Sequence, residues 1–335
     1  MVTSNKKSIR TLLLTSYTCP ETSGSGLNAF RFAGYIGREG GISTLLTFNR
    51  NLKLPGEENL DHFRIIRIPY LNKGKILKII SLPVIISFYV RYILCHDMII
   101  IYGGRIIGWE IAILAALLFR KRIVFQSLLG SIDDIQSIIK RQSGIKASLY
   151  KYIISKIHCY HALNQDFAIQ YRNTFGDTGK MLIAPQGVDS TVFHPMKSKL
   201  EKEKVRARLG LPPNKPIMIS VGFLLNRKGY AGIFNQLAKL DFDFKYLVLG
   251  EYRIESHHFL SRAAKEMNDL FQMGKDLLGE RIAFMGFQNP VEEYYQCADF
   301  FLMNSDQEGF PNALLEAMSC GIPVIIRELK GLTGF

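Results

Sequence analysis

Short runs of branched apolar residues alternate, in the first half of the chain, with longer segments whose apolar residues recur at helical spacing. The short runs predict strands at Arg10–Ser16, Ile42–Thr47, Arg64–Pro69, Met98–Tyr102, Arg122–Ser127, His161–Asn164 and Met181–Pro185. Helices are expected between most of them, at Leu27–Glu39, Lys75–Tyr92, Trp109–Phe119, Lys146–His158 and Asp166–Thr174. Strands that alternate with helices form βαβ units, so this pattern predicts a parallel sheet.

A polar, charged segment that contains proline interrupts the alternation at residues 192–204 and is typical of a linker. Beyond it, strands are expected at Pro216–Val221, Tyr246–Leu249, Arg281–Met285, Asp299–Met303 and Pro323–Ile326. The helices expected between them are Tyr230–Leu240, Ser261–Leu278, Val291–Cys297 and Asn312–Cys320. We therefore expect an α/β fold of two facing Rossmann-like doubly wound domains, residues 1–192 and 193–335, with a ligand at the carboxyl ends of the strands.

The composition is that of a folded protein with a preference for anionic partners. Of the 335 residues, 47% are hydrophobic and 21% are charged, and the formal net charge is +13. This balance favours acidic lipid or phosphorylated substrates; no nucleic-acid recognition motif accompanies it, so nucleic acid is not expected as a partner. The five cysteines show no CxxC pair and no metal spacing, which is typical of reduced thiols in a cytosol. The apolar stretches Ile79–Val90 and Ile106–Phe119 are shorter than the roughly 20 residues of a membrane-spanning helix.

Residues 298–325 carry the densest set of candidate binding residues. An apolar strand ends there in a loop with Glu308, and a helix opens after Pro311, a residue that suits the first helical turn. Glu316 lies on that helix, one to two turns from its start. A helix N-terminus is a suitable site for a diphosphate. The backbone N–H groups expected to face that ligand are those of Phe310, Asn312 and Ala313.

Two glutamates eight positions apart, such as Glu308 and Glu316, do not by themselves indicate a binding site. The first would be favoured by the helix dipole, and the second would be a solvated side chain on the helix face. The whole segment, however, resembles the retaining glycosyltransferases of family 4, whose signature is a glutamate, seven residues and a second glutamate in a run like EGF–xx–LLEAM–xx–G–x–PV. The resemblance implies a GT-B fold in which Glu308 is the catalytic residue that contacts the donor sugar and Glu316 contacts the ribose.

A second candidate loop follows the strand expected at Pro216–Val221. Gly222 allows close approach of the backbone, Lys228 offers a compact charge for phosphate oxygens, and Arg227 offers a planar fork. A surface loop with two solvated cations would show the same residues. Family 4 members resemble this loop, with Val-Gly-Arg at the strand end and Lys-Gly before the helix, so the resemblance implies donor binding by Lys228. Phe223 stands where an arginine is usual.

Two further loops resemble the same family. Gly24 and Gly26 lie in the loop Ser23–Asn28, which by resemblance lines the cleft; an ordinary turn between strand and helix would also contain glycine, and the GxGxxG fingerprint is not present. The turn around Gly187 and Asp189 resembles the family's interdomain turn, with Gly187 supplying the tight turn and Asp189 its cap.

The loop after the strand expected at Arg122–Ser127 lacks the histidine that many family members carry near this place. Asp133 and Asp134 are polar candidates there, although a loop or a helix cap accounts equally for both. Residues 140–156 mix cations with tyrosine and isoleucine at helical spacing, and further cations in this half are Lys73, Lys75, Lys78 and Arg91. Such a surface would suit an anionic bilayer, whereas a solvated helix with its apolar face in the core is the alternative.

We interpret the chain as a retaining glycosyltransferase that moves a sugar from a nucleotide-sugar donor to a hydroxyl of a glycan or lipid-linked acceptor, in cell-envelope polysaccharide or glycolipid synthesis. No cofactor and no metal are expected, because helix N-termini and Lys228 take that role. The expected location is cytoplasmic, or peripheral on the inner face of the membrane. Since family members usually continue beyond the position of Phe335, the resemblance also suggests an incomplete C-terminal domain.

Three other functions are compatible with the same sequence. The main alternative is a catalytically silent GT-B protein, or a truncated fragment, that binds a nucleotide or glycan without turnover. The others are a sugar-nucleotide epimerase and a basic structural protein of the membrane surface.

Overall fold

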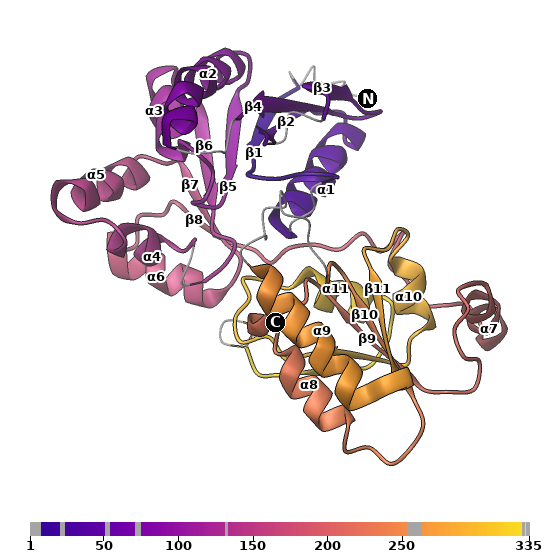
Figure 1. The fold of residues 1–335 in the computed structure, drawn as a ribbon. Coiled ribbons are helices and arrows are strands. Elements are labelled where there is room, and N and C mark those ends of the chain that lie inside the picture. The colour runs from indigo at the N-terminus through magenta and orange to yellow at the C-terminus, as the bar shows by residue number, and fades with distance from the viewer. Residues whose placement is uncertain are drawn as a thin grey trace. The chain divides into compact units, whose positions relative to one another are not determined.

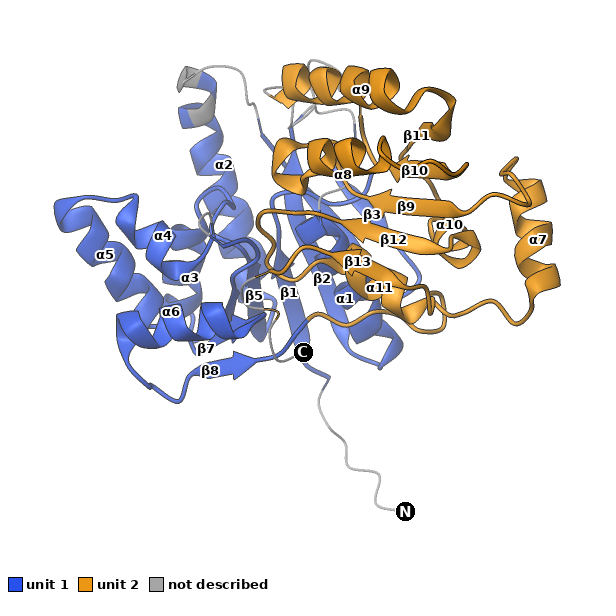
Figure 2. Ribbon diagram, turned by 90° about the horizontal axis from the view of Figure 1, so that it is seen from below, with its two compact units in different colours: residues 1–185 blue, residues 186–335 orange. Residues whose placement is uncertain are grey.

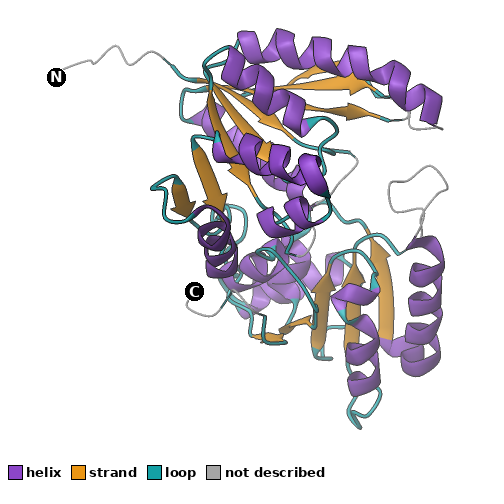
Figure 3. Cartoon of the chain, turned by 90° about the vertical axis from the view of Figure 1, so that its left-hand side faces the viewer, coloured by secondary structure: helices purple, strands orange, loops and turns teal. Residues whose placement is uncertain are grey.

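The computed structural model describes residues 8–20, 24–50, 54–70, 75–130, 133–252, 263–329 and 332. The chain forms two compact units, Met1–Pro185 and Gln186–Phe335 (Figures 1 and 2). Each unit contains one sheet with helices packed against it (Figure 3). Among the helices in the described ranges, none combines the length and the apolar character needed to cross a membrane.

Unit 1 contains an eight-stranded sheet with the order β3-β4-β2-β1-β5-β6-β7-β8. All neighbouring strands are parallel except β3, which runs antiparallel to β4. The strands are β1 (Arg10–Leu14), β2 (Ile42–Asn49), β3 (Glu57–Asn59), β4 (Arg64–Pro69), β5 (Met98–Tyr102), β6 (Arg122–Gln126), β7 (Cys159–Ala162) and β8 (Met181–Ile183). The helices are α1 (Gly24–Arg38), α2 (Lys75–Leu94), α3 (Trp109–Leu118), α4 (Ile135–Lys140), α5 (Gly144–Ser155) and α6 (Gln165–Phe175).

Helix α1 lies close against the sheet of unit 1 because it presents small residues to the strands. Ala29 and Ala33 are fully buried in a cluster with Leu13 and Leu45 from β1 and β2. Ser43 at the start of β2 donates a hydrogen bond of 2.7 Å to the backbone carbonyl of Ala33. This close packing positions the loop between β1 and α1 at the carboxyl edge of the sheet.

Unit 2 contains a five-stranded, fully parallel sheet with the order β11-β10-β9-β12-β13. The strands are β9 (Ile217–Val221), β10 (Lys245–Leu249), β11 (Ile282–Gly286), β12 (Phe300–Met303) and β13 (Val324–Ile326). The helices are α7 (Lys199–Arg208), α8 (Tyr230–Leu237), α9 (Ala264–Leu278), α10 (Glu292–Cys297) and α11 (Asn312–Ser319). In the described part of unit 2, 3₁₀ turns lie at η1 (Asn226–Lys228) and η3 (Gly279–Arg281).

Helices cover both faces of the unit 2 sheet. Successive side chains of each strand point to opposite faces, so each strand contributes to both cores. Ile219 belongs to the cluster that holds Tyr295 of α10 and Leu314 of α11. Its neighbour Met218 belongs to a second cluster with Phe234 of α8 and others from α9. The two clusters are the two cores of a doubly wound sheet, which the sequence pattern predicted.

The predicted linker at residues 192–204 is wrong over its second half, which begins α7. Ser198 caps this helix by accepting a hydrogen bond of 3.2 Å from the backbone N–H of Glu201. Arg206 then anchors the helix to unit 2 through a 2.7 Å ion pair with Asp299. Ser198 and Glu201, three positions apart, are typical of a helix start. The highly charged composition of the segment led to the prediction of a linker instead.

Two further elements end earlier than the sequence predicted. Strand β7 does not reach Asn164, because that side chain accepts a hydrogen bond of 2.9 Å from the N–H of Phe167 and caps α6. Helix α5 does not reach His158, whose N–H donates instead to the carbonyl of Ile123 at 3.0 Å. The short elements β3 and α4 were not predicted, since both are too brief to show a periodic pattern.

Candidate functional site

Two loops meet at the carboxyl edge of the unit 2 sheet. Strands β9 and β12 are parallel neighbours, so the loops that follow them leave the sheet side by side. The N–H of Asp306, in the loop after β12, donates to the carbonyl of Arg227, in the loop after β9, at 2.8 Å. The side-chain amide of Asn304 donates to the carbonyl of Gly229 at 3.1 Å. These bonds hold the two candidate segments of the sequence together.

Gly229 ends the first loop in a position that has no room for a side chain. Its φ of 70° lies in the left-handed region, and a Cβ atom there would lie 1.9 Å from the backbone oxygen of Asn304. This close contact places Lys228, the preceding residue, beside the loop after β12. Asn304 was not among the residues predicted from the sequence.

Lys228, Arg227 and Glu308 form a charged cluster. The Nζ atom of Lys228 lies 2.5 Å from Oε1 of Glu308, and a terminal nitrogen of Arg227 lies 3.8 Å from the same oxygen. The side chains of Glu308 and Lys228 are only 10% and 17% exposed. Burial alone would raise the pKa of Glu308, but the positive charges of Lys228 and Arg227 outweigh it and hold this pKa below its usual value. Two cations around one carboxylate leave an excess positive charge, which suits a further anion.

Gly222 lies just after β9, where the ends of β9 and β10 come into close contact. Its N–H donates to the carbonyl of Leu249 at 2.8 Å, and its carbonyl accepts a hydrogen bond of 3.0 Å from the Tyr230 hydroxyl. A Cβ atom on Gly250 would lie 2.4 Å from the Gly222 oxygen, so the backbones are in close contact here. Phe223, at the position where family members usually carry an arginine, packs against the apolar cluster of α8 and α9.

Helix α11 begins at the end of the second loop, next to Glu308. The helix opens after Pro311, as the sequence predicted: Pro311 is the N-cap residue, with an extended ψ of 110°, and no side chain caps the helix. The carbonyl of Pro311 accepts the N–H of Leu314 at 3.1 Å, which closes the first turn. Phe310, Asn312 and Ala313 surround this helix start, and their binding to a donor stays a prediction.

Glu316 is buried, so the interpretation of a solvated glutamate on a helix face is wrong. Only 5% of the residue is exposed, and its Oε2 atom accepts a hydrogen bond of 2.9 Å from the hydroxyl of Tyr295. Tyr295 is itself fully buried on α10. The contact orients the carboxylate between α10 and α11. No pattern in the sequence pointed to Tyr295, which lies within a short helix of mixed polar and aromatic residues.

The candidates in the first half of the chain belong to unit 1. Gly24 and Gly26 form the first turn of α1, so the predicted loop Ser23–Asn28 is helical from Gly24 onward. Asp134 caps α4 by accepting a hydrogen bond of 2.9 Å from the backbone N–H of Ser137, which agrees with the prediction of a helix cap. Asp133 is buried beside it, and burial raises its pKa to about 6.

Asp189, in the turn that begins unit 2, accepts hydrogen bonds from the backbone and the hydroxyl of Thr191 at 3.0 and 2.6 Å, which confirms the predicted cap. Gly187 in the same turn does not adopt a left-handed φ and has open space around its Cβ position, so the turn does not require glycine there.

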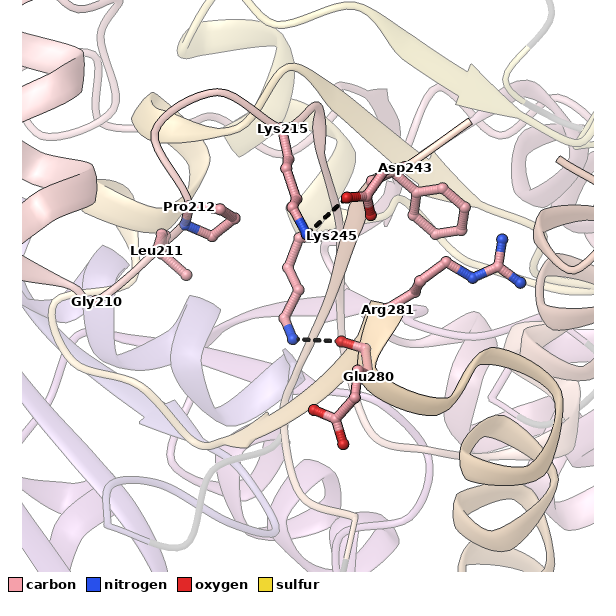
Figure 4. Close-up of a pocket in the computed structure, with 9 residues that line it drawn as sticks. Gly210, Leu211, Pro212, Lys215, Asp243, Lys245, Glu280 and Arg281 are labelled. Atoms are coloured by element: carbon pink, nitrogen blue, oxygen red, sulfur yellow. Dashed lines mark hydrogen bonds and ion pairs between the residues drawn. The ribbon is translucent and has the colours of Figure 1, made fainter. Parts of the chain in front are cut away.

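A pocket of about 420 Å³ lies at the opposite, amino edge of the unit 2 sheet (Figure 4). Lys215 lies 2.7 Å from Asp243 there, and Lys245 donates to the carbonyl of Glu280 at 2.7 Å. The pocket lies away from the loops that carry the predicted donor residues. The described residues contain no group of three or more His, Cys, Asp or Glu side chains placed to hold a metal ion. That no metal is needed stays a prediction.

Comparison with known proteins shows which family and fold the chain resembles. Residues 201–334 match the family model of the glycosyl transferases group 1. Over 97% of the chain, the structure resembles a sucrose-phosphate synthase from Thermosynechococcus elongatus, with a TM-score of 0.72 and 18% identity, and covers 82% of that chain. It resembles Anabaena HepE, solved with UDP and glucose, over 96% of the chain and 82% of HepE, with a TM-score of 0.72 and 17% identity. These likenesses confirm the predicted GT-B fold.

The match over residues 201–334 confirms the resemblance to family 4 found in the sequence. A UDP-Gal:α-D-GlcNAc-diphosphoundecaprenol α-1,3-galactosyltransferase of Escherichia coli is 30% identical over 180 residues, which are 53% of this chain and 43% of that protein. An N-acetyl-α-D-glucosaminyl L-malate synthase of Bacillus anthracis is 22% identical over 333 residues, 94% of this chain and 78% of that protein. The chain thus spans less than half of the first relative.

Proposed function

We propose that the chain is a retaining glycosyltransferase that transfers a sugar from a nucleotide-sugar donor to an acceptor hydroxyl, in the synthesis of a cell-envelope polysaccharide or glycolipid. The observation that carries the proposal is the cluster of Lys228, Arg227 and Glu308 at the carboxyl edge of the unit 2 sheet, beside the start of α11. Relatives named for such reactions, and a structural neighbour solved with UDP and glucose, support it.

The proposed donor site uses the cluster to hold a diphosphate. Lys228 and Arg227 supply the positive charge, and the first N–H groups of α11 supply hydrogen bonds. Glu308 contacts the donor sugar, and Glu316, held by Tyr295, accepts hydrogen bonds from the ribose. Catalysis then consists of positioning and of electrostatic stabilisation of the departing diphosphate, and neither a metal nor another cofactor takes part.

The proposed acceptor is a glycan, either free or linked to a lipid. Two relatives, from Escherichia coli and Campylobacter jejuni, are named for acceptors that carry diphospho-undecaprenol. The Bacillus anthracis relative is named for L-malate. The acceptors in these names all carry phosphate or carboxylate groups.

A thermal-shift screen against UDP, GDP and their sugars tests the donor site. One nucleotide should raise the melting temperature, and Lys228→Ala and Glu316→Ala should each abolish the rise. Lys215→Ala, at the amino edge of the same sheet, is the matched control and should keep it. If a well-folded sample responds to no nucleotide, the proposal is wrong; if it binds but neither hydrolyses nor transfers the donor, the catalytically silent alternative is correct.

We also propose that unit 1 binds an anionic membrane surface through α5, on the cytoplasmic side. The buried face of α5 holds Tyr150, Ile153 and Ile154, as expected of any helix that packs on a core. A second apolar stripe, formed by Ile145, Leu149 and Tyr152, is 90%, 49% and 59% exposed. These three residues recur at helical spacing, so they form one continuous line on the solvent side.

Cations flank the exposed stripe of α5. Lys156 lies with its Nζ atom 4.8 Å from the ring centre of Tyr152 in the stripe, and Lys146 follows Ile145 and lies 5.8 Å from the ring centre of Tyr150 on the buried face. An apolar stripe bordered by lysines matches the boundary between acyl chains and acidic headgroups. A solvated helix would need only its buried face, so the exposed stripe favours the membrane interpretation.

Co-sedimentation with vesicles of phosphatidylglycerol and phosphatidylethanolamine tests this surface. The unchanged chain should sediment with the vesicles, and the double variant Ile145→Ser/Leu149→Ser should remain in solution. Leu200→Ser, which removes an equally exposed leucine from α7, is the control and should sediment like the unchanged chain. Equal sedimentation of the double variant, or none of the unchanged chain, would contradict the proposal.

A further inference from the structure

Arg50 lies in a cage of aromatic rings at the carboxyl edge of the unit 1 sheet. Its guanidinium carbon is 4.4 Å from the ring centre of Tyr17, 5.5 Å from that of Tyr70 and 5.8 Å from that of Phe48. Tyr17 follows β1, Arg50 follows β2 and Tyr70 follows β4, and these three strands are parallel neighbours in the sheet. The cage therefore forms where three loops leave the same edge.

This guanidinium has no anionic partner among the residues that the structure describes. Its Nε atom is buried without a hydrogen-bond partner there, and no carboxylate lies within ion-pair distance. The buried Arg67, by contrast, pairs with Glu58 at 2.8 Å. The hydroxyl of Thr18, one residue beyond Tyr17, is also buried and unpaired within the described part of the chain.

Arg50 as a whole is half-buried, but its Nε atom is withdrawn from water without a hydrogen bond, and the rings offset the cost of this only in part. Each cation–π contact contributes on the order of 0.5–2 kcal/mol, whereas taking a charge out of water costs several. The rings do hold the planar fork in one orientation before a ligand arrives, so little conformational entropy is lost on binding. A bidentate anion would supply the hydrogen bond that Nε lacks and a second one to a terminal nitrogen.

We propose that Arg50 and the surrounding rings bind an anionic group of the acceptor, a phosphate or a carboxylate. The inference rests on the proposed function, because the carboxyl edge of a parallel sheet is where an α/β unit takes its ligand. It assigns to unit 1 a charge-recognition role, distinct from the phosphate-binding cluster of unit 2. A neutral glycan acceptor would gain nothing from this arginine.

Isothermal titration with pyrophosphate, inorganic phosphate and L-malate tests the site separately from transfer. The full chain carrying Lys228→Ala is used, so that the donor-side cluster of unit 2 no longer competes for the anion. At least one of the three probes should bind, and which probe binds identifies phosphate or carboxylate as the recognised group. Adding Arg50→Gln should weaken that binding by about tenfold or more.

Two further variants keep the test decisive. Arg50→Lys retains the charge without the fork and should weaken binding by a smaller factor; it also serves if the glutamine variant does not fold. Arg91→Gln removes an arginine that likewise lies over a ring, that of Tyr92 at 5.7 Å, and should bind the probe like the parent chain. Unchanged binding in Arg50→Gln, equal loss in Arg91→Gln, or binding of none of the probes would overturn the inference. Nucleotide binding by the unchanged chain reports on the proposed function independently.

Discussion

Lys228 and Glu308, 80 positions apart in the sequence, form a 2.5 Å ion pair in which both side chains are largely buried. The lysine comes from the loop after β9 and the glutamate from the loop after β12. In the proposed site the diphosphate of the donor would neutralise part of the positive charge of Lys228, as Glu308 does in its absence. The pair therefore links the stability of unit 2 to ligand binding, and this link can be measured.

Glu308→Gln should lower the melting temperature and slow transfer by about 100-fold or more, since it removes the carboxylate between two cations and the contact with the donor sugar. A bound diphosphate would replace the lost negative charge, so UDP should raise the melting temperature of the variant by more than that of the unchanged chain. Thermal-shift curves with and without UDP measure both effects.

The control for this prediction is Asp306→Asn, in the same loop. Asp306 pairs with Arg327, and both side chains are more than half exposed, so the decrease in melting temperature should be small. An equal rise with UDP in the Glu308→Gln variant and the unchanged chain would contradict the idea that phosphate and carboxylate share one lysine.

Tyr295→Phe tests whether Tyr295 holds Glu316, the proposed ribose-binding residue, in place. It removes the hydroxyl that donates to Glu316 while leaving the ring in the core, so the buried carboxylate loses one hydrogen bond at a cost of about 1–3 kcal/mol. We expect a lower free energy of unfolding in urea and a several-fold weaker nucleotide affinity. Tyr294→Phe, one position earlier on α10, removes a hydroxyl that bonds Gln288 instead and should leave nucleotide affinity unchanged.

Asp133→Asn should stabilise the protein at neutral pH. Burial raises the pKa of Asp133 to about 6, against the opposing charges of Arg105 and Arg141 and with a further contribution from Asp134. A raised carboxyl pKa means that stability is full below the unfolded pKa of 3.8 and is lost as pH rises through 6, by about 3 kcal/mol.

The asparagine variant should therefore melt higher than the unchanged chain at pH 7.5, and the difference should shrink toward pH 4. Asp134→Ala, which removes the cap of α4, should melt lower at both values. A gap between Asp133→Asn and the unchanged chain that stays constant across this range would show that the charge of Asp133 is not the cause.

His96 makes unit 1 sensitive to acid. The ring is buried, with Nδ1 2.6 Å from the carbonyl of Tyr92 and Nε2 2.9 Å from the hydroxyl of Thr44, which also accepts a hydrogen bond from Arg64. Burial lowers the pKa of His96. Its contribution to stability is therefore present above the unfolded pKa of 6.5 and is lost as pH falls through the lower folded value.

Urea unfolding at pH 7.5 and pH 5 measures this dependence. The loss of unfolding free energy between the two values should be smaller in His96→Gln than in the unchanged chain, because the variant has no ring to protonate. His194→Gln removes an exposed histidine and should show the full loss. The same loss in all three proteins would exclude His96 as the sensor.

The sequence alone determined the α/β architecture and singled out the segments proposed to bind the donor. Its alternation of short apolar runs with helical segments predicted both parallel sheets, because the two periods reflect local backbone geometry. The run around Glu308 and Glu316 predicted the family, since its glycine, proline and glutamates occupy fixed positions along one strand, loop and helix. The brief elements β3 and α4, and the charged helix α7, lay outside what periodicity can show.

Only the tertiary structure decided which side chains meet. The pairing of Lys228 with Glu308 depends on β9 and β12 being neighbours in the sheet, although β10 and β11 lie between them in the sequence. The bond from Tyr295 to Glu316 depends on α10 and α11 sharing a face of that sheet, and the cage around Arg50 on three loops leaving one edge. Local pattern fixes the direction and length of an element, but contacts between distant residues follow from strand order and packing, which no short stretch of sequence contains.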